Sequence, residues 1–275
     1  MRLHSYILIL ALLWTSARLS AFAQVDAQEI IQKSVEANKA DWKVQPQYDY
    51  LVNVKKGGHT NTYDVRMILG TPYQVLTAVD GKPLAPDQKA DEQRKLEQAT
   101  QARQKETPQQ RDARIAAWQR GRQRNHMLME EMTKAFDFEL KETEKLNGRD
   151  TYVLTATPRA GYQPPNNQAK VLTGMKGKMW IDKQTYQWAK VEAEVIHPVS
   201  IEGFLARVEP GTRFELRTAP IEQNIWLPTF FSYEAHAKIF FLVPKNASEE
   251  DTYYDYRKST ESTNSVPASP SQPSH

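Results

Sequence analysis

The sequence contains no cysteine among its 275 residues. This absence excludes a disulfide scaffold, a thiol nucleophile and a cysteine-ligated metal site. It also excludes a lipid-modified cysteine at a cleavage site, so the chain is not itself a lipoprotein. A chain without thiols is well suited to an oxidising compartment.

Long apolar runs are scarce, and the clearest one lies at the N-terminus. The segment 6–14 is apolar, follows Arg2, and precedes the small-x-small pattern Ala21-Phe22-Ala23. This layout is that of a secretory signal peptide. The alternative is a membrane anchor, but the run is well short of the roughly 20 apolar residues that span a bilayer. We therefore expect residues 1–23 to be cleaved near Ala23 and the mature protein to be exported.

An excess of basic residues is also lacking. The formal net charge is +3, and removal of Arg2 and Arg18 with the signal peptide brings it to +1 (3 − 2). A basic face is the footprint of nucleic acid binding. We therefore expect no nucleic acid partner.

The common catalytic and metal-binding motifs are absent. There is no G-x-S-x-G, no glycine-rich phosphate loop and no G-x-G-x-x-G. His126 and Glu130 have i, i+4 spacing, but no third metal ligand accompanies them. Asp182 is interpreted as a turn former, because an Asp side chain can bond its own backbone. We expect no catalytic residue, no metal and no cofactor; an exported hydrolase that uses scattered carboxylates is the minor alternative.

The chain that follows the signal peptide begins with a predicted amphipathic helix over residues 26–41. Asp26 can serve as its N-cap, with Glu29 three residues on as in a capping box. Ile30, Ile31 and Val35 give the helix one apolar face, which must dock on another element.

Alternation of apolar and polar residues then predicts antiparallel strands. The first three cover residues 48–54, 62–69 and 72–79, with turns at Gly57-Gly58 and Asp80-Gly81. Further runs of this kind start at residue 136, turn at Asn147-Gly148, and continue to about residue 256. With eight to eleven such runs, we predict an α+β protein whose large antiparallel sheet is curved.

Residues 84–135 interrupt the strands with a Gln-, Glu-, Lys-, Arg- and Ala-rich segment. Pro108 divides it into two predicted helices, because an interior proline breaks a helix. Ile115, Trp118, Met129 and Met132 form a sparse apolar stripe, and Arg120, Arg122 and Arg124 lie between them. We favour a solvated helical insertion; the alternative is a basic surface helix that touches anionic lipid or nucleic acid.

The C-terminal residues 258–275 are rich in Ser, Thr, Pro and Asn. Such a composition buries too little apolar surface to offset the entropy of ordering, so we predict a disordered tail.

The stretch "GKMWIDKQTYQWAKVEAEV" at 177–195 predicts a hairpin with a turn at 182–185. This turn would pair Trp180 with Gln187. Paired residues share a face, so Trp180 is expected to share an apolar face with Ala189, Val191, Ala193 and Val195. Lys190, Glu192 and Glu194 would form the charged, solvent-exposed face. Helices must then cover the apolar face of the sheet, and the segments 26–41 and 84–135 are the candidates.

Two short segments carry a resemblance to a known family. "NGRDTYVL" at 147–154 and "MWIDKQT" at 179–185, in the order helix, strands and paired strands, resemble the LolA-like superfamily of periplasmic proteins. That superfamily includes the lipoprotein carrier LolA, the receptor LolB and the sensor domain of RseB. The resemblance extends over most of residues 26–256; the insertion at 84–135 and the C-terminal tail depart from it.

The resemblance implies an incomplete β-barrel covered by helices, over residues 24–257, around an apolar cavity in the periplasm. It implies a non-catalytic, monomeric carrier of lipid or lipoprotein acyl chains, with peripheral membrane contact as an option. The alternative is an envelope-stress sensor or interaction module that binds an envelope protein. The side chains expected to line the cavity are Tyr50, Val52, Val65, Met67, Phe138, Trp180, Val191 and Val195.

Overall fold

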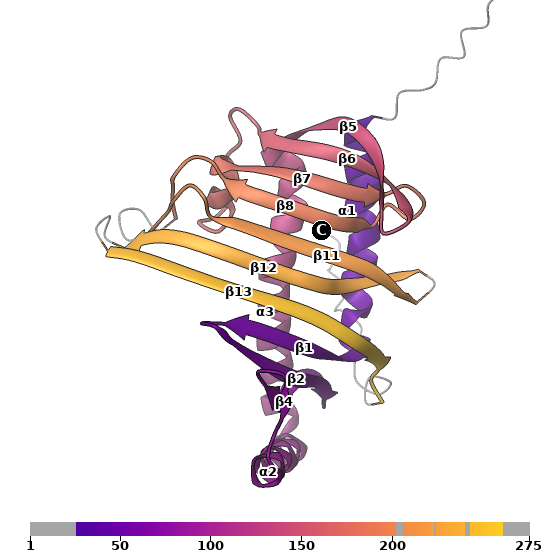
Figure 1. Ribbon diagram of the computed structural model, residues 1–275, viewed down its shortest axis with the longest axis vertical. Coiled ribbons are helices and arrows are strands. Elements are labelled where there is room, and N and C mark those ends of the chain that lie inside the picture. The colour runs from indigo at the N-terminus through magenta and orange to yellow at the C-terminus, as the bar shows by residue number, and fades with distance from the viewer. Residues whose placement is uncertain (1–25, 202–205, 223, 240–242, 261–275) are drawn as a thin grey trace, which may run out of the picture.

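The protein is described by a computed structural model that covers residues 26–201, 206–222, 224–239 and 243–260. The predicted signal peptide and residues 261–275 of the predicted tail lie outside the described residues. The predicted start of the tail at residue 258 is too early, because Lys258 is the last residue of β13 (Val243–Lys258) and Ser259 is buried, with its backbone N–H donating to the Gln47 carbonyl at 2.8 Å. Within these ranges the chain forms one antiparallel sheet of 13 strands with the order β4-β3-β2-β1-β13-β12-β11-β8-β7-β6-β5. β4 and β5 end this order without pairing to each other, so the sheet is open (Figure 1).

The strands follow the predicted alternation, but the 13 strands exceed the eight to eleven runs expected, partly because β4 and β9 are only two residues long. They are β1 (Tyr48–Lys56), β2 (His59–Ile68), β3 (Thr71–Val79), β4 (Lys82–Pro83), β5 (Phe136–Leu146), β6 (Arg149–Pro158), β7 (Met175–Asp182), β8 (Trp188–Val195), β9 (Val199–Ser200), β10 (Ala206–Val208), β11 (Arg213–Glu222), β12 (Ile225–Ile239) and β13 (Val243–Lys258). β9 and β10 lie off the main order and attach through β12. The predicted Asp80-Gly81 and Asn147-Gly148 turns are present, with both residues of each at positive φ, as tight hairpins require.

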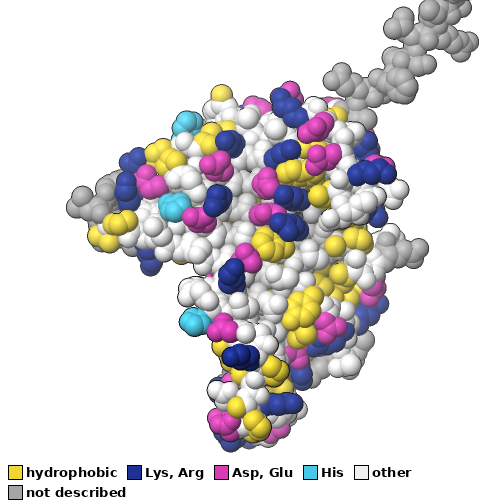
Figure 2. Space-filling model, in the orientation of Figure 1, with side chains coloured by type: hydrophobic (Ala, Val, Ile, Leu, Met, Phe, Trp, Pro, Cys, Tyr) yellow, Lys and Arg dark blue, Asp and Glu magenta, His cyan; other side chains and the backbone are white. Residues whose placement is uncertain are grey.

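The two faces of the sheet differ in character. Val191, Leu216 and Phe231 align across β8, β11 and β12, and form an apolar row on one face. This inner face is covered by α1 (Ala27–Val44) and α3 (Pro108–Ala135), which pass behind the sheet in Figure 1. The outer face, turned toward the viewer in Figure 2, carries interleaved basic and acidic side chains. The fold is therefore a curved open sheet with helices on its apolar side, as predicted.

Helix α1 is held by its cap and by its apolar face. The Asp26 side chain accepts a hydrogen bond of 3.0 Å from the Gln28 backbone N–H, as an N-cap does. Glu29 forms an ion pair with Lys33. Ile30 and Ile31 are fully buried in a core cluster with residues of β6, β7 and β8. The helix continues to Val44, three residues beyond the predicted end.

Asp41 connects the last turns of α1 to the sheet. Its buried carboxylate accepts a hydrogen bond of 3.0 Å from the Trp226 backbone N–H at the start of β12. Burial raises the pKa of Asp41 to about 6, against the opposing effect of the Trp226 hydrogen bond. The contact positions the C-terminal end of α1 over β12.

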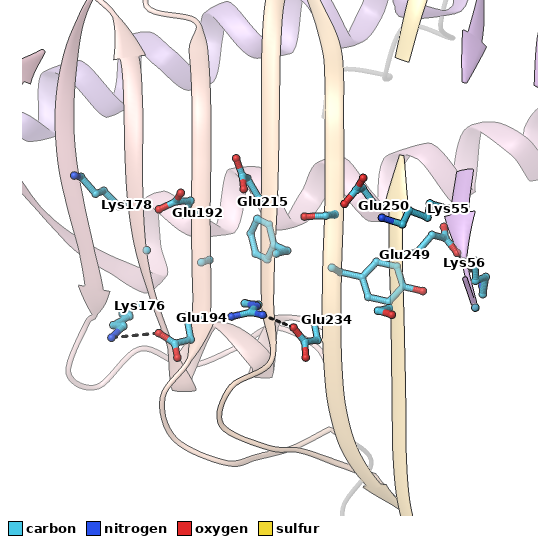
Figure 3. A pocket seen from close by; sticks show the side chains of 18 of the residues that line it. Lys55, Lys56, Lys176, Lys178, Glu192, Glu194, Glu215, Glu234, Glu249 and Glu250 are labelled. Carbon is cyan, nitrogen blue, oxygen red and sulfur yellow. Dashed lines mark hydrogen bonds and ion pairs between the residues drawn. The ribbon is translucent and has the colours of Figure 1, made fainter. Parts of the chain in front are cut away.

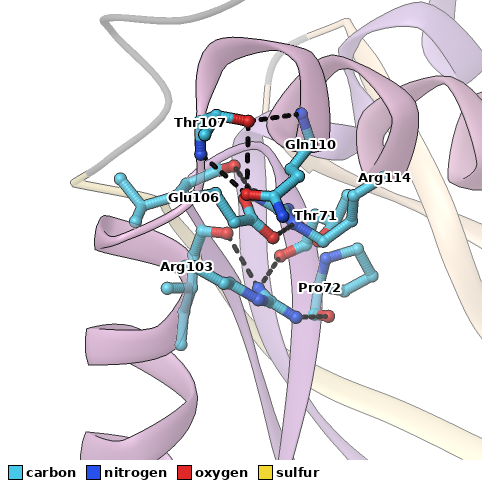
Figure 4. A network of polar contacts seen from close by, with 9 residues as sticks. Thr71, Pro72, Arg103, Glu106, Thr107, Gln110 and Arg114 are labelled. Atoms are coloured by element: carbon cyan, nitrogen blue, oxygen red, sulfur yellow. Dashed lines mark hydrogen bonds and ion pairs between the residues drawn. The ribbon is translucent and has the colours of Figure 1, made fainter.

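Helices α2 (Pro86–Gln104) and α3 meet at an elbow that is fastened to the β2–β3 turn (Figure 4). Arg103 donates to the backbone carbonyls of Ile68 and Thr71, at 2.8 Å each. Arg114 donates to the Thr71 hydroxyl at 2.7 Å and pairs with Glu106 at 2.6 Å. The predicted helix break at Pro108 is confirmed, because Pro108 is the first residue of α3.

The two helices pack on opposite faces of β2 and β3. Leu96 of α2 packs against Ile68 and Val75, which face away from the inner side. Ile115 of α3 approaches Gly70 in the β2–β3 turn so closely that a Cβ there would lie 2.7 Å from the Ile115 side chain. Gly70 also has φ +92°, a conformation that favours glycine. The inserted segment therefore straddles the edge of the sheet.

The predicted register of the 177–195 hairpin is wrong. Ile181 pairs with Trp188 and Trp180 with Lys190, with a bulge between them. β7 ends at Asp182 and β8 begins at Trp188, so residues 183–187 form the loop, which is longer than the predicted four-residue turn. Within this loop Tyr186 adopts φ +59°. Val191 and Val195 do face the inner side, but Trp180 lies on the outer face. There it is buried between Lys178 and Lys190, whose Nζ atoms lie 4.7 and 4.8 Å from its ring centroid.

Asp182 organises this loop, as its interpretation as a turn former predicts. Its carboxylate is 1 % exposed and accepts hydrogen bonds from the Gln184 and Thr185 backbone N–H groups. Arg149 pairs with it at 2.6 Å. Burial raises the pKa of Asp182, but the hydrogen bonds from Arg149 and Thr185 outweigh burial, so the pKa lies below its usual value.

Replacement Asp182→Ala is expected to destabilise the protein by about 3 kcal/mol, because it leaves Arg149 and two loop N–H groups without their acceptor. Urea denaturation at neutral pH measures this loss. The exposed neighbour Asp150 serves as the control, and Asp150→Ala should change stability by well under about 1 kcal/mol. Because the pKa of Asp182 is lowered on folding, its contribution is present above about pH 4 and is lost as pH falls below that value. If Asp182→Ala lowered the free energy of unfolding at pH 2 by as much as at neutral pH, this account would be contradicted.

Asp41→Asn tests the other buried carboxylate described above, whose contribution to stability should depend on pH in the opposite direction to that of Asp182. The pKa of Asp41 is raised on folding to about 6. Its contribution to stability is therefore full below about pH 4 and declines as pH rises through about 6. The Asn variant keeps an acceptor for Trp226 and cannot ionise, so it should lack this decline. Thermal unfolding of both proteins between pH 4 and 7 measures the difference; parallel profiles would contradict the assignment.

Candidate functional site

A cavity of about 830 Å³ lies between the inner face of the sheet and the covering helices. Its floor consists of side chains from β1, β2, β8, β11, β12 and β13, and its cover consists of α3 and the C-terminal end of α1. The lining is mainly aliphatic, aromatic and thioether: it includes Trp42, Tyr50, Met67, Trp118, Leu128, Met129, Met132, Leu172, Met175, Trp188, Val191, Val195, Phe214, Leu216 and Phe231. Such a lining favours the hydrocarbon part of a ligand.

Helix α3 presents one stripe of side chains to the cavity. Trp118, Arg122, His126, Met129 and Met132 recur at intervals of four, four, three and three residues, and all of them line the cavity. This spacing places them on one side of a helix. The stripe is apolar at both ends and polar at its centre.

The sheet side of the cavity is apolar because strand pairing aligns apolar residues of neighbouring strands on the inner face. Val195, Phe214 and Leu216 all point to the inner face, where their partners on the neighbouring strands are also apolar or small. Met175, at the start of β7, pairs with Val195 and adds a thioether. Methionine side chains adapt to irregular shapes, so this wall can accommodate ligands of differing form.

A tyrosine cluster lies at the side of the cavity formed by β1 and β13. The rings of Tyr50 and Tyr253, which line the cavity, are 5.8 Å apart between centroids, and Tyr256 lies 5.3 Å from Tyr50. The Tyr253 hydroxyl donates to Asp251 at 2.9 Å. Burial raises the pKa of Asp251 and of all three tyrosines.

Four of the eight side chains predicted to line a cavity are brought together there: Tyr50, Met67, Val191 and Val195. The other four do not contribute to it. Val52 and Val65 are buried on the same face of the sheet as Tyr50. Phe138 packs against the core cluster around Ile30 and Ile31 and against a second cluster that includes Phe136 and Met175. Trp180 lies on the outer face, where the bulge in the hairpin turns it away.

The sequence pattern predicts the apolar stripe with Trp118, Met129 and Met132, but it does not identify Arg122 and His126 as cavity residues. The signal was present, because both residues continue that stripe at helical spacing. Sequence spacing alone instead places Arg122 with Arg120 and Arg124 among the solvated charges. Only the arrangement of α3 over the sheet shows that Arg122 faces inward while Arg120 is exposed.

A second hollow, of about 870 Å³, crosses the sheet between the β1–β2 turn and β6 (Figure 3). It is lined by charged side chains of alternating sign. Lys176 pairs with Glu194 at 3.3 Å and Arg213 with Glu234 at 2.5 Å. Lys56 similarly pairs with Glu249 at 2.8 Å. These charges compensate one another, so the inner cavity is the stronger candidate for an apolar ligand.

The described residues contain no group of three His, Asp or Glu side chains that could hold a metal ion. In the same part of the chain, no helix combines the length and hydrophobicity needed to cross a bilayer.

Comparisons with known proteins returned solved structures only; no family model and no curated protein matches the chain. One similar structure is a domain described as an outer membrane lipoprotein-sorting protein, from Vibrio parahaemolyticus, with 13% identity and a TM-score of 0.34; the match covers 86% of this chain and 94% of that one. A LolA superfamily protein from Nitrosomonas europaea has 14% identity and a TM-score of 0.32, with the same coverage.

The complex of MucA and MucB from Pseudomonas aeruginosa is also returned, with 11% identity, a TM-score of 0.25, and coverage of 86% of this chain and 99% of the matched chain. All these TM-scores are low, and the similarities therefore assign no function to the chain.

Proposed function

We propose that this protein is an exported, non-catalytic binding protein that holds the hydrocarbon part of an amphiphile, such as a lipid or a lipoprotein acyl chain, in its inner cavity. The observation that carries the proposal is the cavity of about 830 Å³ with its apolar lining. Its volume falls within the range of about 300–1,000 Å³ that is usual for small-molecule sites.

The energetics of this proposal need no specific reactive group. Each methylene that moves from water into the cavity contributes about 0.8 kcal/mol. The methionines and aromatic rings of the wall provide contact area without fixing one ligand shape. The lack of a catalytic motif in the sequence is consistent with binding alone.

The cellular location forms part of the proposal. The expected signal peptide at residues 1–23, the absence of cysteine and the LolA-like motifs favour the periplasm. A carrier of acyl chains in that compartment would shield them from water between two membranes.

A second function is favoured by the charged hollow on the sheet. Its alternating lysines and glutamates could recognise an envelope protein with complementary charges, so that the fold would act as a sensor or interaction module. Affinity capture from envelope extracts would distinguish the two functions. Recovery of a stable protein partner by a form of the protein that contains no lipid would favour this second candidate.

Leu216→Trp tests the proposed function by filling the cavity. Leu216 lines the cavity from β11, and the larger ring should displace about two methylenes of ligand, which corresponds to roughly tenfold weaker binding. Binding of the fluorescent amphiphile N-phenyl-1-naphthylamine measures the effect. Lipid extraction and mass spectrometry of the purified protein test for ligands that it retains from the cell.

The matched control is Glu215→Trp, which adds the same ring to the opposite face of the same strand. It should leave binding of the probe unchanged. Equal affinity of the two variants, or a wild-type protein that retains no amphiphile and binds no probe, would contradict the proposed function.

A further inference from the structure

Arg122 places a positive charge in the wall of the apolar cavity. The guanidinium lies between two indole rings, with its Cζ 4.4 Å from the ring centroid of Trp42 and 5.2 Å from that of Trp118. Nη2 donates to the Trp42 backbone carbonyl. Among the residues that the structure describes, no carboxylate forms an ion pair with Arg122. Burial lowers its pKa to about 10, which indicates a charge that is poorly solvated and not neutralised.

His126 lies one turn further along the same stripe. Its ring stacks on Trp42, with centroids 4.4 Å apart and planes inclined by 11°. The side chain is 7 % exposed, and neither ring nitrogen has a hydrogen-bond partner in the described structure. The nearest carboxylate oxygen, Oε1 of Glu130, is 3.6 Å from Nε2. A buried polar group without a partner is rare and calls for an explanation.

The charge around this point is positive. Burial is the main cause that lowers the pKa of His126, and Lys39, Lys43 and Arg122 lower it further, whereas Glu130 opposes them. Glu130 is shared with Lys39, at 3.5 Å. The surplus of positive charge thus lies where two polar side chains face a mainly apolar cavity, whose other polar lining residues include Gln45, Thr212 and Arg213.

We propose that Arg122 and His126 bind the anionic head group of the amphiphile, so that the ligand class is a carboxylate or phosphate with a hydrocarbon tail. The inference rests on the proposed function, because the tail would occupy the cavity. A guanidinium has five N–H donors in a planar fork that suits a carboxylate or phosphate. Hydrogen bonds to an ionised partner are stronger than neutral ones, particularly where water is excluded.

Arg122 also has a structural role, which the test must separate from ligand binding. Its contact with the Trp42 carbonyl caps the last turn of α1, where a positive charge is favourable. This capping would support the cavity for any ligand, whether charged or neutral. A specific effect on charged ligands is therefore the diagnostic observation.

The experiment offers the delipidated protein palmitate and cetyl alcohol together, and measures the bound ratio after gel filtration and extraction. The two share a hydrocarbon tail and differ in the head group. The wild-type protein is expected to prefer palmitate by at least about tenfold, the effect of one charge-assisted contact. Arg122→Gln should bring the ratio close to one, whereas Arg122→Lys should retain part of the preference. His126→Phe, which keeps a ring on Trp42, should reduce it several-fold.

Arg120→Gln is the matched control, because Arg120 is an exposed arginine on the same helix. It should keep the wild-type ratio. Thermal unfolding of each variant shows whether α1 and α3 remain in place. A separate arm measures protection from thermal unfolding by inorganic phosphate alone, which should be much weaker than protection by palmitate.

Each outcome is decisive. Binding of both amphiphiles in equal amounts would overturn this inference and leave the proposed function standing. Binding of neither would overturn both. Equal protection by inorganic phosphate would assign Arg122 and His126 to a free anion, and would overturn the inference of a lipid head group.

Discussion

The structure depends on one constraint: a broad antiparallel sheet has an apolar face that must be kept from water. α1, α3 and the short 3₁₀ helix Ala169–Gly174 lie against that face, and α1 and α3 meet it along their own apolar stripes. These elements do not fill the space inside a curved sheet of this width, and the residual volume is the cavity. The candidate site thus exists because the apolar face of the sheet is larger than the helices that cover it, and does not depend on any one residue.

The segment formed by α2 and α3 connects the two faces of the sheet in this arrangement. Its elbow is fastened to the β2–β3 turn by Arg103 and Arg114, and from that anchor α3 runs back across the inner face. α2 covers the opposite face of the same strands through Leu96. This segment therefore supplies part of the cover of the cavity, through α3, together with Arg122 and His126.

Much of the fold could be predicted because local rules agree with it. Alternation marks the strands, Asp80-Gly81 and Asn147-Gly148 mark the hairpins, and Asp26 and Pro108 mark helix starts. The face of Trp180 could not be predicted, because it depends on a bulge and on the positive φ of Tyr186, which residue spacing does not encode. The same limit applies to the site. Val191 and Val195 follow from alternation along one strand, whereas Arg122 faces inward only because of how a long helix lies over a distant sheet.

The open edge of the sheet has a consequence for the behaviour of whole molecules. Among the described residues, no second strand pairs with β5, which is eleven residues long, so one side of its backbone lacks a strand partner. Such an edge is a template for adding another chain. This strand carries Glu139, Lys141, Glu142, Glu144 and Lys145, and a bulge interrupts it between Leu140 and Glu142. Charge and irregularity of this kind oppose edge-to-edge growth into aggregates.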